Sequence, residues 1–361
     1  MKMYRIILII FLISSGLAAQ QLPLYSQYMF DNYLINPAVS GTHDYTMVNG
    51  SIRQQWNGFD KNSVNAVQDG VTSPIAPLTI SLSGSHSFGD HVSAGGMYLS
   101  DEFLGFKNQK LQFSGAYRFR FSENLNMSLS IGLYMQTLKL FNSYVEPWSE
   151  NDPLWTAGIG SEESDTYWDG IFGLYIYNDR FDFGLSIENL RQGEYDDIGN
   201  YLNPIYADDE ETTNNGIYTD NRAIRHLFLH SSYDFQIDWA NSLSIVPSML
   251  LKSTFVTKPQ LDLNLKVIYW DFFWLAASFR TSDNVIAPMV GINTEKLCIG
   301  YSYDISNSAL ASVHQNTHSI SLGIYFSNTN DNKHVRKRNR FSELRLSKPG
   351  GWFYWYPKSK W

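Results

Sequence analysis

The sequence predicts a transmembrane antiparallel β-barrel of about 14 strands, an all-β fold, on three observations. Apolar and polar residues alternate over long segments of the chain. Aromatic residues are abundant and charged residues are scarce. The connections between these segments are short and long in alternation along the chain, as they are when successive strands cross a membrane in opposite directions.

The composition favours a protein that faces lipid. Of the 361 residues, 43% are hydrophobic, 15% aromatic and 17% charged, whereas roughly a quarter of a soluble domain is charged. Barrels in membranes carry belts of Trp and Tyr at both interfaces. An aromatic-rich secreted β-sandwich has a similar composition, so composition alone does not decide between the two.

The N-terminus predicts export. Lys2 and Arg5 precede an apolar run over residues 6–13, and small residues follow up to Ala19. This pattern is typical of a signal peptide, and the run is shorter than the roughly 20 apolar residues of a membrane-spanning helix. We therefore divide the chain as follows: signal peptide 1–19, periplasmic cap or plug 20–43, barrel 44–326, and basic, aromatic-rich periplasmic tail 327–361.

The strands are read from their alternation. From Leu125 to Met135, for example, every second residue is apolar and the residues between are mostly polar or small, so one face of the strand is apolar. Such runs exceed the about five or six residues usual for soluble strands and suit a tilted crossing of a bilayer. Lipid offers no hydrogen bonds, so the sheet must close. The expected strands are 44–56, 76–87, 91–101, 108–121, 125–140, 166–178, 181–189, 224–236, 241–253, 259–269, 271–281, 284–294, 296–304 and 316–326.

The connections predict the orientation. The second, fourth and sixth turns are tight, whereas the first, fifth and seventh connections are long, at 57–75, 141–165 and 190–223. Outer-membrane barrels have short periplasmic turns and longer outer loops. We therefore expect this protein in the outer membrane of the cell. Because the number of strands is even, both termini are expected in the periplasm.

Charged residues are expected on the inner face. Two interpretations stay open for them: they line a pore, or they pair and close the lumen, which we favour because charges in a low dielectric need partners. The residues in question are Arg53, Arg118, Arg120, Asp234, Asp262 and Lys266.

The tail stands apart from the body by its charge. The whole chain has a net charge of −8, yet residues 329–361 hold nine Lys and Arg against Asp331 and Glu343. We predict a periplasmic docking peptide, because Arg and aromatic residues are typical binding hot spots; a solvated basic arm is the alternative. Its basic part holds Arg336, Lys337, Arg338 and Arg340, and its aromatic part holds Trp352 and Trp355.

Catalysis and metal binding find little support in the sequence. Cys298 is the single cysteine, expected to be a small buried residue, and no Cys/His cluster has metal-ligand spacing. The acidic loops at 141–165 and 190–220 lack the spacing of an EF-hand, so solvated loops are favoured over Ca²⁺ sites. The motifs of serine hydrolases and zinc proteases are missing. We expect no enzyme, no cofactor, no metal and no nucleic-acid partner.

Two motifs carry a family resemblance. Asn36-Pro37-Ala38, followed by Gly41, precedes the first strand, and Arg53-Gln54-Gln55-Trp56 closes it. If Trp56 faces lipid, the alternation puts Arg53 and Gln55 inside. Together with Asp152-Pro153-Leu154-Trp155, the segment 247–252 and the segment 300–304, they resemble the PorP/SprF family of outer-membrane barrels over residues 21–326.

The resemblance implies an accessory barrel of the type IX secretion and gliding machinery. Members are linked to periplasmic ring or peptidoglycan-associated proteins, and others pair with a secreted adhesin that they help to export or to hold at the surface. Carried onto this sequence, the candidate binding residues are Asn36, Pro37, Arg53, Gln55 and Trp56. An outer-membrane channel for small solutes is the alternative function.

Overall fold

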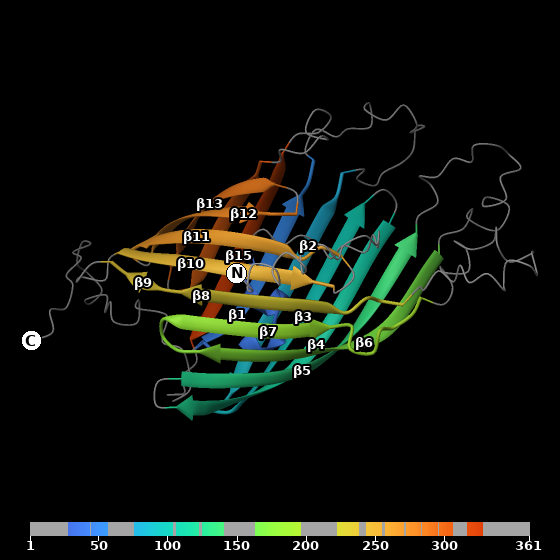
Figure 1. The fold of residues 1–361 in the computed structure, drawn as a ribbon, viewed down its shortest axis with the longest axis horizontal. Coiled ribbons are helices and arrows are strands. Elements are labelled where there is room, and N and C mark those ends of the chain that lie inside the picture. The colour runs from blue at the N-terminus through green and yellow to red at the C-terminus, as the bar shows by residue number, and fades with distance from the viewer. Residues whose placement is uncertain are drawn as a thin grey trace, which may run out of the picture.

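A computed structural model shows one closed, antiparallel sheet (Figure 1). The residues that it describes are 28–43, 45–56, 76–103, 106–122, 125–140, 163–195, 222–237, 243–254, 257–270, 272–282, 284–294, 296–305 and 316–327. The predicted signal peptide, the tail and most of both acidic loops lie outside these residues. Within the described part, no helix is long and apolar enough to cross a membrane.

Successive strands pair with one another around the sheet, and the last pairs with the first, which closes the barrel. The strands are β1 (Tyr45–Gln54), β2 (Leu78–Phe88), β3 (Val92–Phe103), β4 (Phe106–Ser122), β5 (Leu125–Leu140), β6 (Glu163–Tyr177), β7 (Phe181–Glu188), β8 (His226–Tyr233), β9 (Phe235–Gln236), β10 (Leu243–Ser253), β11 (Gln260–Tyr269), β12 (Phe273–Arg280), β13 (Val285–Asn293), β14 (Leu297–Asp304) and β15 (Thr317–Ser327). Because β8 and β9 both pair with β10, they count as one strand of the barrel. The predicted 14-stranded barrel is confirmed.

The break between β8 and β9 interrupts the predicted strand 224–236. The backbone N–H of Asp234 bonds to the carbonyl of Arg180 rather than to β10. On β10, Pro247 lies opposite the break, and proline has no N–H to give to a ladder. The alternation of side chains runs through this point unchanged, which is why the sequence predicted a single strand.

The outer face of the barrel is apolar. Ile52, Leu82, Phe113, Ile131 and Leu133 are each more than half exposed, and similar side chains point outward from the other strands. Along β4 the apolar stretch from Leu111 to Phe121 spans about 25 Å of height, at roughly 3.4 Å per residue and a tilt of about 40°. That height matches the lipid-facing band of an outer-membrane barrel.

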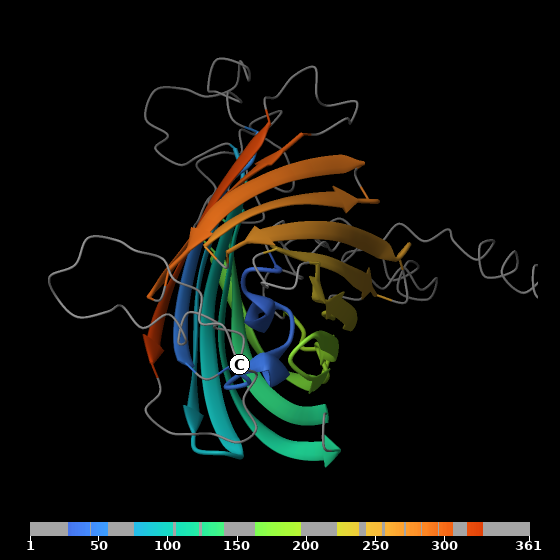
Figure 2. The same cartoon turned by 90° about the vertical axis from the view of Figure 1, so that its left-hand side faces the viewer.

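The inner face is polar, and it is occupied. Residues 28–43, here called the inner segment, form two short 3-10 helices, η1 (Asn32–Leu34) and η2 (Pro37–Val39). Figure 2 shows both helices inside the ring of strands. Most of the inner segment is buried, so among the described residues this segment occupies part of the barrel interior.

Candidate functional site: the occupied lumen

The inner segment holds its own shape through local hydrogen bonds. The Asp31 carboxylate accepts a bond from the N–H of Tyr33 at 3.2 Å and caps η1. The Asn36 side chain accepts one from the N–H of Ala38 at 3.0 Å and caps η2, whose first residue, Pro37, has no N–H that would need an acceptor. Gly41 has a φ of 64°, which favours glycine. The motif read as a turn is thus a capped helical turn.

Asn36 also fixes the inner segment to the barrel wall. Its amide donates to the carbonyl of Leu174 on β6 at 3.0 Å, and lies 3.3 Å from Nε2 of His230 on β8. The side chain is completely buried. One asparagine therefore caps a helix and joins two strands that are separated in sequence.

Asp31 and Tyr33 attach the segment to the opposite wall. Ser83 on β2 donates to the Asp31 carboxylate, and the Tyr33 hydroxyl lies 2.7 Å from Ser114 Oγ on β4. Burial raises the pKa of Asp31 to about 6, although hydrogen bonds from Ser83, Asn49 and the Tyr33 N–H oppose this shift. Burial likewise raises the pKa of the Tyr33 hydroxyl to about 12. The lumen therefore favours the neutral form of both groups.

Arg118 on β4 anchors the far end of the inner segment. Its guanidinium donates to the carbonyl of Gly41, to the hydroxyl of Ser87, and to the carbonyl of Gly89 at 2.7 Å. The residue is fully buried. Ser93 on β3 adds a bond to the carbonyl of Ser40 at 2.7 Å. The end of the segment is thus tied to three strands and one short turn.

Apolar contacts and glycines complete the fit. Tyr28 and Ile35 form a buried cluster with Phe228 on β8 and Leu250 on β10, and Phe30 packs against Trp274 on β12 with ring centroids 6.0 Å apart. A Cβ added at Gly173 would collide with Asn36 and Ser130, and one at Gly95 would collide with the Tyr33 ring. The wall is shaped to this segment at these positions.

A chain of alternating charges lies in the lumen nearer the long loops. Arg53 on β1 and Arg280 on β12 both reach the Asp304 carboxylate on β14, at 2.9 and 3.3 Å. Lys252 on β10 pairs with Asp262 on β11 at 3.1 Å. All five side chains are largely buried. Their mutual pairing compensates the cost of burying each charge.

A second polar cluster lies across the lumen, between β4 and β8. Lys110 pairs with Glu188, and its ammonium lies 4.1 Å from the centre of the Tyr134 ring. Asp169 accepts backbone N–H bonds from Gly170, Arg191 and Gly193 at 2.6–2.7 Å. The first residues after β7 are thereby held against the inner wall.

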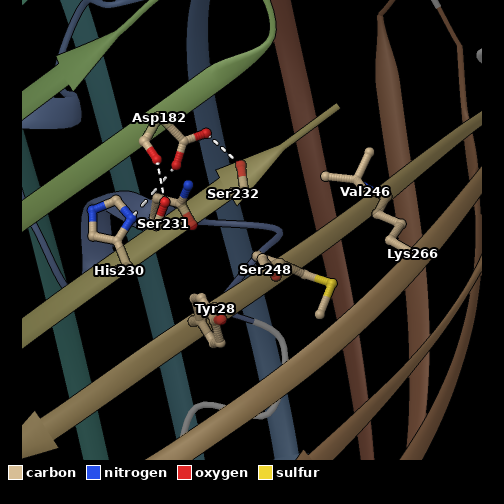
Figure 3. A pocket seen from close by; sticks show the side chains of 10 residues that line it. Tyr28, Asp182, His230, Ser231, Ser232, Val246, Ser248 and Lys266 are labelled. Carbon is tan, nitrogen blue, oxygen red and sulfur yellow. Dashed lines mark hydrogen bonds and ion pairs between the residues drawn. The ribbon is translucent and has the colours of Figure 1, made fainter. Parts of the chain in front are cut away.

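A small pocket lies beside the inner segment (Figure 3). Tyr28, Asp182, His230, Ser232 and Lys266 are among the residues that line it, and it offers about 30 Å³ to water, room for one or two molecules. Asp182 accepts a bond from Ser232 at 2.5 Å and lies 3.8 Å from His230 Nδ1. Because the other ring nitrogen faces Asn36, these residues do not form the nucleophile–base pair of a hydrolase.

Five of the six predicted lumen charges are buried or half-buried. Arg53 and Asp262 join the chain of ion pairs, and Arg118 is buried but bonds to carbonyls and a hydroxyl. Lys266 lies 4.9 Å from the centre of the Trp274 ring, and Asp234 is half-buried at the β8–β9 break.

Arg120 corrects the prediction. It is exposed at the end of β4, where the register of pairing with β5 shifts, and it forms no ion pair with any described residue. A charge at the rim of the barrel is hydrated and needs no partner.

The motif at the end of β1 also differs from expectation. Gln55 lies just past the strand, and its N–H bonds to the carbonyl of Pro77 at 2.9 Å. Trp56 has a φ of 51°, so the alternation does not extend to it. Its ring packs edge-on against Phe103 at 5.2 Å between centroids. The expected lipid-facing position of Trp56 assumed a strand that continues to residue 56, whereas β1 ends at Gln54.

Several residues of the site escaped the sequence analysis. They are Lys110, Glu188, Asp169, Lys252, Arg280 and Asp304. The alternation of apolar and polar residues along their strands would have placed each of them on the inner face. Assigning every charged residue of each strand to one face would therefore have found them. The prediction that Cys298 is buried is confirmed, with 5% exposure. No cluster of metal-ligating residues occurs within the described ranges.

Comparison with known proteins agrees with this architecture. The model of a family described as type IX secretion system membrane protein PorP/SprF matches residues 17–324. No curated protein sequence matches the chain significantly.

Three solved structures illustrate the likeness in fold. A Pseudomonas aeruginosa FadL homologue has a TM-score of 0.44 and 10% identity, over 86% of this chain and 96% of its own. The Pseudomonas putida toluene transporter TodX has 0.44 and 11%, over 82% and 93%. The Acinetobacter baumannii outer membrane protein Omp33 has 0.41 and 10%, over 80% and 100%.

A closed antiparallel sheet with an apolar outer belt and a filled polar interior defines a β-barrel of the outer-membrane type. The family model spans the inner segment and nearly the whole barrel. The chain belongs to the PorP/SprF family of type IX secretion system membrane proteins.

Proposed function

We propose that this protein is an accessory barrel of the type IX secretion machinery whose lumen is closed. In this proposal it binds periplasmic ring or peptidoglycan-associated components, a secreted surface adhesin, or both, and so supports export or surface attachment. The observation that carries the proposal is the inner segment, which lies in the lumen and forms hydrogen bonds to β3, β4, β6, β7 and β11. A protein that does not conduct acts through the surfaces that it presents.

The closed lumen argues against the alternative, a channel for small solutes. A conducting barrel needs a continuous path of water past its constriction. Here the half of the lumen nearer the short turns holds the inner segment, and the other half holds paired charges. The small pocket beside Tyr28 has room for one or two water molecules. Conduction would require the inner segment to leave.

We assign the partner surfaces from the orientation of the barrel. The short turns are placed in the periplasm and the long loops outside, as in other outer-membrane barrels. Both chain ends then lie in the periplasm, where the tail 327–361 would dock through its basic and aromatic residues. Asn36 and Pro37 act in this proposal by holding the inner segment in place, since both are buried and lie out of a partner's reach.

A pulldown tests the proposal. The tagged full chain is solubilised in mild detergent, and co-purifying proteins are identified by mass spectrometry. Stoichiometric recovery of periplasmic ring proteins or of a secreted adhesin is expected. A chain lacking residues 329–361 should lose the periplasmic partner while keeping the heat-modifiable band of a folded barrel. Recovery of the barrel alone from the full chain would contradict the proposal and favour the channel.

A further inference from the structure

On the outer face of β3–β6, three successive rows of side chains toward the long loops change from apolar to polar to charged. The registers of these strands align each row across the sheet. The last apolar row is Tyr98, Leu111, Met135 and Trp168; the next is Ser100, Gln109, Thr137 and Thr166; the third is Glu102, Lys107, Lys139 and Ser164. The exposed Trp168 and Tyr98 mark the first row as an interfacial aromatic belt.

The third row contains an unusual pair of like charges. Lys107 and Lys139 lie directly opposite each other on neighbouring strands, an arrangement that destabilises a sheet. Lys107 pairs with the Glu102 carboxylate at 3.4 Å. Lys139 forms no ion pair or hydrogen bond with the residues that the structure describes. Among the described residues, the Glu102 carboxylate thus accompanies one of the two adjacent ammonium groups, that of Lys107.

The height of the pair above the apolar belt matches a headgroup. Two rows of a tilted strand correspond to about 10 Å along the membrane normal, and the polar headgroup layer adds several ångströms beyond the hydrocarbon core. Lysine side chains bend back toward that layer while their stems cover apolar surface. The hydroxyls of Thr137 and Thr166, 2.8 Å apart, lie between the lysines and the belt.

We propose that Lys139 and Lys107 bind the phosphate of an outer-leaflet lipid. The two ammonium groups hold the phosphate, the hydroxyls of Ser164, Thr137 and Thr166 can donate further bonds, and the acyl chains lie on the belt below. Glu102 remains on Lys107 and fixes its position. A lipid is favoured over an acidic protein because the two lysines lie on the same outer face as the apolar belt, only two rows above it, so one amphipathic molecule can contact both.

Lipid titration tests this proposal on the full chain. The protein is purified in detergent, stripped of lipid and titrated by native mass spectrometry. The probes are a bisphosphorylated lipid A and the same lipid A with both phosphates removed. We expect the wild type to prefer the phosphorylated form about 30-fold, the product of roughly fivefold for each of the two lysines near a membrane surface.

Matched variants decide the role of the two lysines. The double variant Lys107→Gln/Lys139→Gln should bind both lipids alike, whereas Lys139→Arg should keep the preference. Lys258→Gln, at an exposed lysine between β10 and β11, should behave as the wild type. Heat-modifiability on a gel confirms that each variant is folded. Equal binding of both lipids by the wild type, or an equal loss in Lys258→Gln, would overturn the proposal.

Discussion

Replacing Asn36 by alanine should loosen the inner segment while leaving the barrel intact. The substitution removes the cap on η2, worth about 1 kcal/mol. It also removes the bond to the Leu174 carbonyl, worth about 1 kcal/mol. Together, the two losses destabilise the bound position of the inner segment by about 2 kcal/mol. Since about 1.4 kcal/mol is a factor of ten, the fraction of molecules whose inner segment has left the lumen should rise roughly 30-fold.

A thiol in the inner segment reports this population. Ser40 is fully buried and its hydroxyl has no bonding partner among the described residues, so Ser40→Cys is a mild change. In a Cys298→Ser background, a water-soluble maleimide should label this thiol only when the segment moves out. The labelling rate should rise about 30-fold in Asn36→Ala.

Two controls separate the cap from the cross-lumen bonds. Asn36→Ser keeps a capping oxygen but cannot reach Leu174, so its rate should lie between those of the wild type and Asn36→Ala. Thr79→Val removes a buried bond to Asp101 of 2.5 Å that does not involve the inner segment, and should leave the labelling rate unchanged. An equal rate in Asn36→Ala and the wild type would refute the anchoring role.

Three further substitutions probe the lumen. Gly173→Ala places a methyl group against Asn36, and should raise labelling of the same reporter about tenfold or more, because overpacking costs about 1–3 kcal/mol. Asp31 has a raised pKa, about 6, so its contribution to stability is fully present below about pH 4 and is lost as the pH rises through 6. The thermal midpoint of the wild type on gels should accordingly fall between pH 4 and pH 7 by more than that of Asp31→Asn, and parallel curves would argue against this. Asp304→Asn removes the carboxylate charge that two buried arginines share and should cost about 3–5 kcal/mol, measured as a lower thermal midpoint. A midpoint equal to that of the wild type would show that these ion pairs do not contribute to stability.

The strands were predictable because lipid imposes a simple rule on each of them. An outward apolar residue at every second position is required by the membrane, and the runs on β4 and β5 are long enough to show it without ambiguity. The rule fails where that requirement ends. Asp234 breaks its strand through backbone bonding to Arg180, Arg120 stands at the hydrated rim, and Trp56 turns away after the last residue of β1.

The lumen was predictable only in outline. Residue parity placed Arg53, Arg118 and Asp262 inside, but it could not tell which of them pair with each other. The partners of Asn36 lie on β6 and β8, far away in the sequence. A local sequence pattern does not predict such contacts. A cap or plug at 20–43 was expected, whereas the fit of residues 28–43 to Gly95 and Gly173 depends on the closed sheet.

Conductance across a planar bilayer tests the closed lumen most directly. The full chain is compared with a chain lacking residues 28–43, each verified as a folded barrel by its heat-modifiable band. The full chain should remain closed, and the deletion should open steps of conductance typical of a wide barrel. Steady conductance through the full chain, or a folded deletion that stays closed, would contradict the account.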